Sequence, residues 1–192
     1  GPSFTHNGEL MPVTNENMKQ VYEWCDKYGL RTCSFTMIGI PTETEEEIWE
    51  TIQMTANLKP YLIRLTFCYP FENTRLWFFC KERNLVKEEK LYQQHGYFEE
   101  SVIKLPISDE KLLSYRHLFP WYVNSILLPT NMAEKYSQMI ETFSSSDYRN
   151  LNILEKIVEI DKGLSESCGG LEHYCFFANN TAYFHCKNKR MG

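Results

Sequence analysis

The sequence predicts an α/β fold in which a parallel strand–helix–strand unit is followed by a helical segment and a C-terminal β-hairpin. Three observations support this fold class. An apolar strand over residues 31–40 runs into a Gly-Ile-Pro turn, and a capped helix begins directly behind it. A second apolar strand follows after a short link, which is the spacing of parallel strands joined by a crossover helix. Near the end of the chain, two apolar runs flank Asn179-Asn180, a pair suited to a tight hairpin turn.

Length and charge exclude some classes of protein. The 192 residues are enough for a sizeable core, and the formal net charge of −5 argues against a large basic nucleic-acid-binding surface. No apolar run has the length of a membrane span, and no secretory signal opens the chain. The seven cysteines therefore favour thiols or metal ligands in a reducing, cytoplasmic environment over a disulfide framework. Gly1-Pro2-Ser3 has the appearance of a tag-cleavage scar and is left out of the fold prediction.

An N-cap threonine, Thr14, and a C-terminal glycine, Gly29, bound the first predicted helix. Apolar side chains form one stripe along it at three- and four-residue spacing: Met18, Val21, Tyr22, Cys25 and Tyr28. The strand over residues 31–40 is apolar on both faces near its end, which is typical of a buried parallel strand. Behind this strand, Thr44 and Glu47 have capping-box spacing, so the next helix is expected to begin there.

The second helix completes the parallel unit. Ile48, Ile52 and Ala56 recur at helical spacing and are expected to face the sheet. Pro60 ends the connection, and the second strand is expected over residues 61–69.

The part of the chain before the hairpin is predicted to be mainly helical. Further helices are expected over residues 74–82, 131–143 and 147–161. Ser108 is the predicted N-cap of another helix, which Pro120 is expected to break or kink because proline lacks a backbone N–H.

The predicted hairpin gathers chemistry-bearing side chains. Pairing Ala178 with Thr181 sets the register of its two strands. Because side chains alternate along a strand, His173, Cys175 and Cys186 then share one face.

The carboxyl ends of the two parallel strands form the candidate ligand site, because ligands bind at that edge of open and barrel α/β sheets. Gly39 allows a ligand to approach the backbone closely, and Pro41 fixes the turn. Tyr69 and Asn73 occupy the equivalent place after the second strand. From these residues alone, a packed turn with an ordinary helix cap is the alternative, since no nucleophile and base lie close together in the sequence.

An ordered series of motifs over residues 14–85 resembles the second half of the barrel of radical S-adenosylmethionine enzymes, in the branch that often carries a cobalamin-binding domain. In chain order the motifs are Lys27-Tyr28-Gly29-Leu30, Phe35–Pro41, Glu43-Thr44, Glu45–Ile48, Thr51-Ile52, Phe67–Pro70, Thr74 and Leu76. The resemblance implies that residues 4–105 form part of a (β/α) barrel. The residue patterns predict that a helical segment follows over residues 106–162 and a cysteine-containing hairpin tail over residues 163–192.

The resemblance also implies a chemistry. Members of this family bind S-adenosylmethionine on a four-iron four-sulfur cluster and cleave it reductively to a 5′-deoxyadenosyl radical, which abstracts hydrogen from the substrate. On the matching positions, Ile38 and Gly39 would lie beside the adenosine, with Pro41 in the same wall. The positions that would border the substrate are Tyr69, Asn73 and Thr74. Cobalamin is left open as a further cofactor.

The chain departs from the family pattern at decisive places. It has no C-x-x-x-C-x-x-C loop to hold the cluster, and Asn73 stands where the family often has a glycine. We therefore expect the C-terminal part of a longer enzyme, inactive by itself, whose partner is the missing N-terminal barrel half. Exposed strand edges would also allow homo-oligomers. The alternative is a non-catalytic α/β scaffold or interaction domain.

The tail resembles, more distantly, the SPASM or twitch extensions that hold auxiliary iron–sulfur clusters. The candidate ligands are Cys168, His173, Cys175 and Cys186. Thiolate and imidazole ligands suit either an iron–sulfur cluster or zinc. The alternative is that these cysteines are packed hairpin residues, and the scaffold interpretation admits a small zinc site here.

Overall fold

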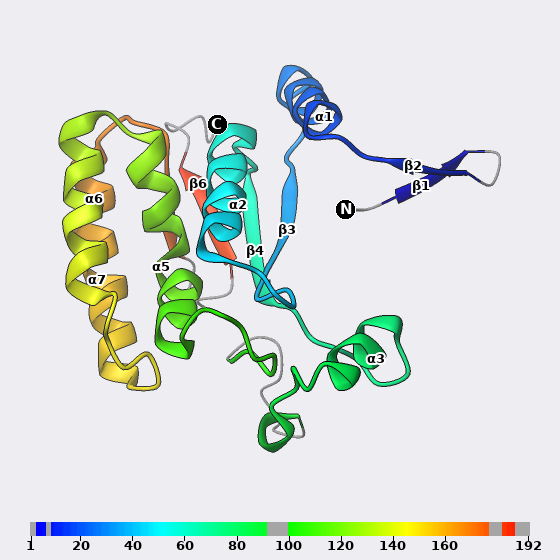
Figure 1. Cartoon of the computed structure of the whole chain (residues 1–192). Coiled ribbons are helices and arrows are strands. Elements are labelled where there is room, and N and C mark those ends of the chain that lie inside the picture. The colour runs from blue at the N-terminus through cyan, green and yellow to red at the C-terminus, as the bar shows by residue number, and fades with distance from the viewer. Residues whose placement is uncertain (1–2, 7–8, 92–99, 177–181, 187–192) are drawn as a thin grey trace.

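The computed structural model describes residues 3–6, 9–91, 100–176 and 182–186. It has a mixed α/β fold in which helices lie against a four-stranded sheet of order β3-β4-β6-β5 (Figure 1). The elements in chain order are β1 (Ser3–His6), β2 (Glu9–Pro12), α1 (Asn15–Lys27), β3 (Cys33–Ile38), α2 (Glu45–Leu58), β4 (Leu62–Phe67), α3 (Arg75–Glu82), the 3-10 helix η1 (Glu88–Lys90), α5 (Asp109–Leu127), α6 (Thr130–Phe143), α7 (Leu151–Cys168), β5 (His173–Phe176) and β6 (Ala182–Cys186). None of the described helices is both long and apolar enough to span a membrane.

The predicted strand–helix–strand unit is confirmed. Strands β3 and β4 are parallel, in a register that pairs Cys33 with Leu62 and Ile38 with Phe67, and α2 connects them. The predicted capping box is present, because Thr44 accepts a hydrogen bond from the backbone N–H of the third helical residue and that residue's carboxylate accepts one from Thr44.

The C-terminal hairpin joins this unit and makes the sheet mixed. Strand β6 pairs antiparallel with β4, and β5 pairs antiparallel with β6. The predicted register is confirmed, since His173 lies opposite Cys186 and Cys175 lies opposite Phe184. The predicted turn at Asn179-Asn180 lies outside the described residues.

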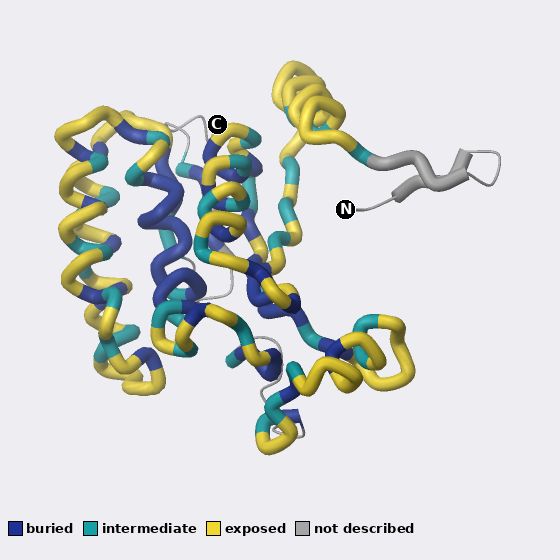
Figure 2. Tube along the Cα trace, viewed as in Figure 1, coloured by how far each residue is buried: buried dark blue, intermediate teal, exposed yellow. Residues whose placement is uncertain are grey.

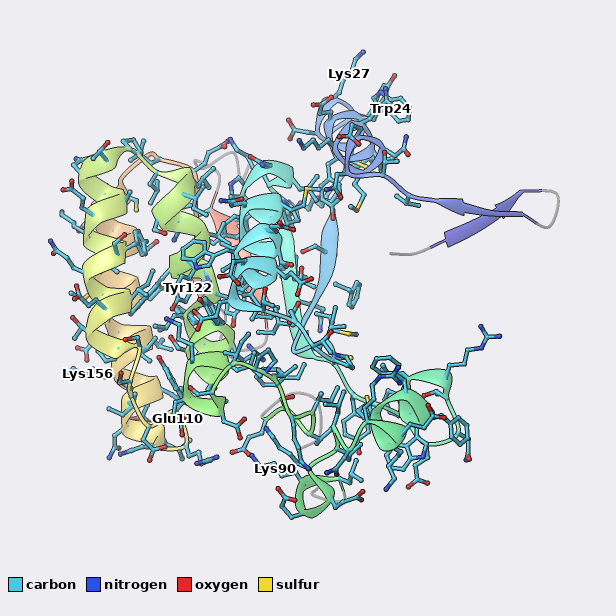
Figure 3. The ribbon with its side chains drawn as sticks, viewed as in Figure 1. Trp24, Lys27, Lys90, Glu110, Tyr122 and Lys156 are labelled. Carbon is cyan, nitrogen blue, oxygen red and sulfur yellow. The ribbon has the colours of Figure 1, made fainter. Side chains whose placement is uncertain are left out.

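One face of the sheet carries the main hydrophobic core. Side chains from β3, β4 and β6 that share this face are buried against α2 and α5: Ile38, Ile63, Leu65, Phe67 and Tyr183. From the helix side, Tyr122 lies between α5 and α2 (Figure 3), and its ring meets that of Trp49 edge to face at 5.6 Å. Figure 2 shows α5 as the most continuously buried helix, with α6 and α7 outside it.

Side chains from two helices close the outer edge of β5. Asn124 of α5 accepts a hydrogen bond from the backbone N–H of Tyr174 (2.7 Å) and donates one to the carbonyl of the same residue (2.8 Å). Asp161 of α7 accepts hydrogen bonds from the backbone N–H of Phe176 (2.9 Å) and from Nε1 of Trp121 (2.7 Å). These side chains take the place of a neighbouring strand and satisfy backbone groups that an edge strand leaves open.

The opposite edge of the sheet and the second face of β3 are open in the described part of the chain. Strand β3 was expected to be buried on both faces, but Phe35 is 81% exposed and Met37 is 47% exposed. This expectation was wrong because β3 is the last strand of the sheet and no helix covers its second face. The apolar stripe of α1 is partly uncovered, with Val21 and Tyr28 exposed and Met18, Tyr22 and Cys25 half-buried.

Helix α5 continues through Pro120, so of the predicted break or kink the break was wrong. A proline at this position deprives the carbonyl of Arg116 of its helical donor. The hydroxyl of Tyr183, on β6, donates to that carbonyl at 2.7 Å and accepts a hydrogen bond from Nη1 of Arg116 at 2.8 Å. A side chain from the sheet therefore replaces the missing helical hydrogen bond.

Helix α7 continues to Cys168, beyond the boundary predicted after residue 162. Four residues, 169–172, connect α7 to β5, and Asp161 and Ser165 of α7 contact the hairpin.

The contact between Tyr183 and Arg116 generates a double-mutant prediction. Tyr183→Phe removes both hydrogen bonds from a fully buried position and should lower the free energy of unfolding by about 2 kcal/mol. In a Pro120→Ala background, the restored N–H at position 120 serves the Arg116 carbonyl, so the same substitution should cost about 1 kcal/mol less.

Urea unfolding of the four proteins measures this coupling. The matched control is Tyr174→Phe, which removes another buried hydroxyl that donates to a backbone carbonyl, that of Pro60. Its effect should be independent of Pro120→Ala. Additive effects of Tyr183→Phe and Pro120→Ala would contradict the proposed replacement.

Asp161 generates a prediction about pH. Burial outweighs its hydrogen bonds from Phe176 and Trp121 and raises the pKa of its carboxyl from 3.8 to about 6. Between these values the folded chain binds more protons than the unfolded chain, so this group's contribution to stability falls as the pH rises. The stability difference between wild type and Asp161→Asn should decline by about 2–3 kcal/mol from pH 4 to pH 7.

Asp109→Asn supplies a control of opposite sign. Although Asp109 is partly buried, Lys87 and Lys90 hold the pKa of its carboxyl below the ordinary value. Its contribution is therefore lost as the pH falls below about 4, so the difference from wild type should grow with rising pH in that range. Denaturant unfolding of wild type and both variants across the pH series distinguishes the two predictions. A stability difference between wild type and Asp161→Asn that does not change with pH would disprove the raised pKa of Asp161.

Candidate functional site

Two similar turns lie at the carboxyl edge of the parallel strands. After β3, the backbone N–H of Glu43 donates to the carbonyl of Ile40 (2.9 Å), and α2 begins behind its N-cap Thr44. After β4, the N–H of Thr74 donates to the carbonyl of Phe71 (3.2 Å), and Thr74 is the N-cap of α3. Because the strands are parallel, both turns lie at the same edge of the sheet.

Each turn holds its third residue in the left-handed region of backbone conformation. Thr42 has a φ of 71° and Asn73 a φ of 63°. Asparagine tolerates this region, but a β-branched threonine is strained there. Strain of this kind is concentrated at functional sites, which makes the turn after β3 the more informative of the two.

Gly39 packs the turn after β3 against neighbouring side chains, and Glu43 stabilises the turn from within. Gly39 has a φ of 77°, and a Cβ at this position would lie 3.5 Å from Oγ of Ser101 and 3.6 Å from side-chain atoms of Phe67 and Leu112. The buried carboxylate of Glu43 accepts hydrogen bonds from the backbone N–H groups of Gly39 and Ile40. Burial raises the pKa of Glu43 despite these hydrogen bonds.

The three positions predicted to contact the cofactor are all buried. The side chain of Ile38 lies in the core on the helix-covered face, and its carbonyl accepts a hydrogen bond from the N–H of Cys68 (2.8 Å). Gly39 and Pro41 are buried in the turn. Contact with a ligand at these positions would be through the backbone, and the predicted assignment stays a prediction.

Exposed apolar side chains lie next to the positions predicted to contact the cofactor. Phe35 and Met37 project from the open face of β3, and Ile40, which is 45% exposed, follows them at the turn. The motif-based prediction missed these three residues. For Phe35 and Met37 the available signal was the alternation of side chains along the strand, because residues on the face opposite Ile38 are those that a ligand on the open face would meet. Ile40 lies beyond the end of β3, where this signal does not apply.

The positions predicted to border the substrate lie around the second turn. Tyr69 is half-buried, and its hydroxyl donates to the carbonyl of Leu91 at 2.7 Å, which ties this turn to the segment after η1. Asn73 and Thr74 are exposed, and Oγ1 of Thr74 accepts a hydrogen bond from the N–H of Trp77. The structure therefore brings the three positions together at one turn.

An ionic cluster supports this edge from the helix side. Nζ of Lys90, labelled in Figure 3, lies 2.7 Å from the carboxylate of Glu100 and 3.2 Å from that of Asp109 at the start of α5. Lys87 and Arg149 pair with the same two carboxylates. The partners are distant in the sequence, so no local pattern predicts the cluster. It fixes the segment after β4 against α5.

The four predicted metal ligands divide into a group of three and an isolated cysteine. His173, Cys175 and Cys186 share one face of the hairpin, and Sγ of Cys175 lies 2.9 Å from Sγ of Cys186. Cys168 is buried on α7, where its sulfur lies 3.7 Å from the hydroxyl of Tyr136. No group of three or more histidine, cysteine or acidic side chains in the described part of the chain is arranged to hold a metal ion.

Hydrogen bonds engage both ring nitrogens of His173. Nδ1 lies 2.8 Å from the carbonyl of Leu171, and Nε2 lies 2.6 Å from Oγ of Ser165. A carbonyl only accepts, so Nδ1 carries a proton, and Nε2 shares a hydrogen bond with the hydroxyl of Ser165. Contact between Cys175 and Cys186 raises the pKa of the first thiol and lowers that of the second.

Comparison with known proteins gives one partial likeness. An uncharacterized methyltransferase from Pyrococcus horikoshii is 30% identical over 74 residues, which make up 38% of this chain and 16% of that protein. The chain thus matches less than a fifth of that relative's length. No protein-family model matches the chain, and no solved structure matches it.

The strained turn after β3 generates a prediction. Thr42→Gly removes the cost of a β-branched residue at positive φ and should raise the free energy of unfolding by about 1 kcal/mol, after the added flexibility of the unfolded chain is subtracted. Thr44→Ala, two residues away, should lower it by about 1 kcal/mol because it removes the N-cap of α2. Thermal and urea unfolding measure both effects, and a destabilised Thr42→Gly variant would show that the threonine side chain has a stabilising contact.

Proposed function

We propose that this chain is the C-terminal part of the partial barrel of a radical S-adenosylmethionine enzyme. In this proposal it supplies the carboxyl edge against which the adenosine and the substrate bind. The motif series over residues 14–85 supports the family. The observation that carries the proposal is that β3 has an open face and an open outer edge in the described residues. Both lie beside the two similar turns that follow β3 and β4.

The geometry of the sheet supports a missing barrel half. In a (β/α) barrel, helices cover one face of each strand and the other face points into the barrel. Here α2 covers the face of Ile38, and the opposite face of β3 exposes Phe35 and Met37. In the described chain, β3 pairs only with β4, so its outer edge is where a strand of the N-terminal half would add.

The open face has features that suit the adenosine of S-adenosylmethionine. Phe35, Met37 and Ile40 form an exposed apolar series that ends at the turn after β3. An apolar wall next to exposed backbone suits a purine ring and its polar edge. The relative named a methyltransferase is consistent with use of S-adenosylmethionine, a common methyl donor.

The residues of this chain do not fit the four-iron four-sulfur cluster. The sequence has no cysteine triplet at the family spacing, and the cysteines described in the structure do not converge as a set of three. In our proposal the missing half binds the cluster. The role of this chain is therefore to bind and orient, and no catalytic step is assigned to its side chains.

Anaerobic reconstitution of the full-length enzyme with iron, sulfide and S-adenosylmethionine tests the proposal. We expect reductant-dependent formation of 5′-deoxyadenosine. Ile40→Asp places a charge on the apolar wall at a solvent-exposed position and should reduce this product at least tenfold by weakening S-adenosylmethionine binding.

The matched control is Ile126→Asp, since Ile126 is 41% exposed on α5 and the proposal assigns it no ligand contact. This variant should form the product at the wild-type rate. A well-formed cluster without 5′-deoxyadenosine would refute the proposal, and a full-length protein without a cysteine triplet would favour the scaffold alternative.

A further inference from the structure

Two cysteines meet on the hairpin in a way that the proposed function does not use. Cys175 on β5 and Cys186 on β6 are half-buried, and their sulfur atoms are 2.9 Å apart. The register places Cys186 opposite His173 and Cys175 opposite Phe184, so the cysteines are diagonal neighbours on one face. Diagonal side chains on adjacent strands converge only when both lean toward each other.

The distance between the sulfurs bears on what the pair can do. A disulfide bond is about 2.05 Å long. Two thiolates that share a tetrahedral zinc, each about 2.3 Å from the metal, lie about 3.8 Å apart. The observed pair is nearly 1 Å closer than that second arrangement, so a metal between the sulfurs would have to push them apart.

The surroundings of the pair also favour a bond between the sulfurs over a shared metal. His173 on the same face already has hydrogen bonds at both ring nitrogens, to Leu171 and Ser165. Asp161 uses its carboxylate oxygens for Trp121 and Phe176. Further ligands for a metal would have to break the contacts that hold the hairpin to α7.

The other cysteines in the described part of the chain lack this arrangement. Cys68 and Cys80 are buried in a separate cluster beside α3, and burial raises the pKa of both thiols. Cys168 is buried against Tyr136, Cys33 is exposed on the open face of β3, and Cys25 is half-buried on α1. Direct sulfur–sulfur contact combined with partial exposure is thus found at Cys175 and Cys186.

We propose that Cys175 and Cys186 form a thiol–disulfide exchange site that reacts with small-molecule disulfides and closes a reversible bridge between β5 and β6. The thiolate of one cysteine attacks a sulfur of the disulfide RSSR, which forms a mixed disulfide and releases RS⁻. The second cysteine loses its proton and attacks the protein sulfur of the mixed disulfide, which releases the other RS⁻. The two protein thiols are oxidised, RSSR is reduced to two RSH, and the two protons end on the released thiols.

The bridge would act on the part of the hairpin that holds the sheet to the helices. Tyr174, Phe176 and Tyr183 lie on these two strands and contact α5 or α7 through hydrogen bonds. A covalent link across the strands restricts the unfolded chain, so the oxidised protein should melt about 5 °C higher than the reduced protein.

The test uses the full chain in buffers of graded oxidised-to-reduced glutathione ratio, with alkylation and peptide mass mapping. In wild type, Cys175 and Cys186 should lose their reactivity together and regain it on reduction. Cys175→Ser and Cys186→Ser should each stop at a stable mixed disulfide with glutathione on the remaining cysteine. Cys33→Ser is the matched control and should leave oxidation of the pair unchanged.

Three outcomes would overturn the inference. The first is independent oxidation of the two cysteines, and the second is a bridge that forms between other cysteines. The third is stoichiometric zinc or iron in the purified chain, released by Cys186→Ser and protecting both thiols from alkylation. That last result would instead establish the hairpin as a metal site. The inference does not depend on the proposed function, because it is tested without S-adenosylmethionine or cluster.

Discussion

The two edges of the sheet are satisfied in different ways, and this difference determines the architecture of this protein. At β5, the side chains of Asn124 and Asp161 satisfy the outward-facing backbone groups of Tyr174 and Phe176. Those hydrogen bonds require α5 and α7 to stand beside the sheet, and the core between them follows from that placement. At β3 there is no corresponding contact in the described residues. Within the described residues, one edge of the sheet is therefore closed by side chains of the same chain, and the outer edge of β3 pairs with no strand.

Features set by neighbouring residues were predictable from the sequence. The cap at Thr44, the parallel unit and the hairpin register all depend on spacing within short stretches, and the structure agrees with each. Features set by distant residues were not predictable. A break or a kink was expected at Pro120; the helix is not broken there, and Tyr183 from another part of the chain donates to the carbonyl that the proline leaves without a helical donor. The insertion of β6 beside β4 likewise depends on packing that no local pattern reports.

The candidate site was likewise predictable only where it depends on neighbouring residues. Motif positions located the carboxyl edge and brought Tyr69, Asn73 and Thr74 to one turn. The motif did not say which side of β3 a ligand would reach. Because side chains alternate, Ile38 points into the core and Met37 points to the open face. Glu43 belongs to the motif series, but the hydrogen bonds that it accepts from the backbone N–H groups of Gly39 and Ile40 were not predicted, since they depend on a turn that positive φ angles create.

The place of β6 between β4 and β5 has a consequence for synthesis on the ribosome. A growing chain emerges from its N-terminus, so β4 can pair early with β3 but must wait for β6, which comes from a distant part of the sequence. The hydrogen bond from Tyr174 of β5 to Pro60 likewise spans 114 positions. Until then the inner edge of β4 and the carbonyl freed by Pro120 have no native partner. The helices can form early from local contacts, but the sheet is completed late. Until then the unpaired edge of β4 is exposed to aggregation, which chaperones prevent by binding such edges.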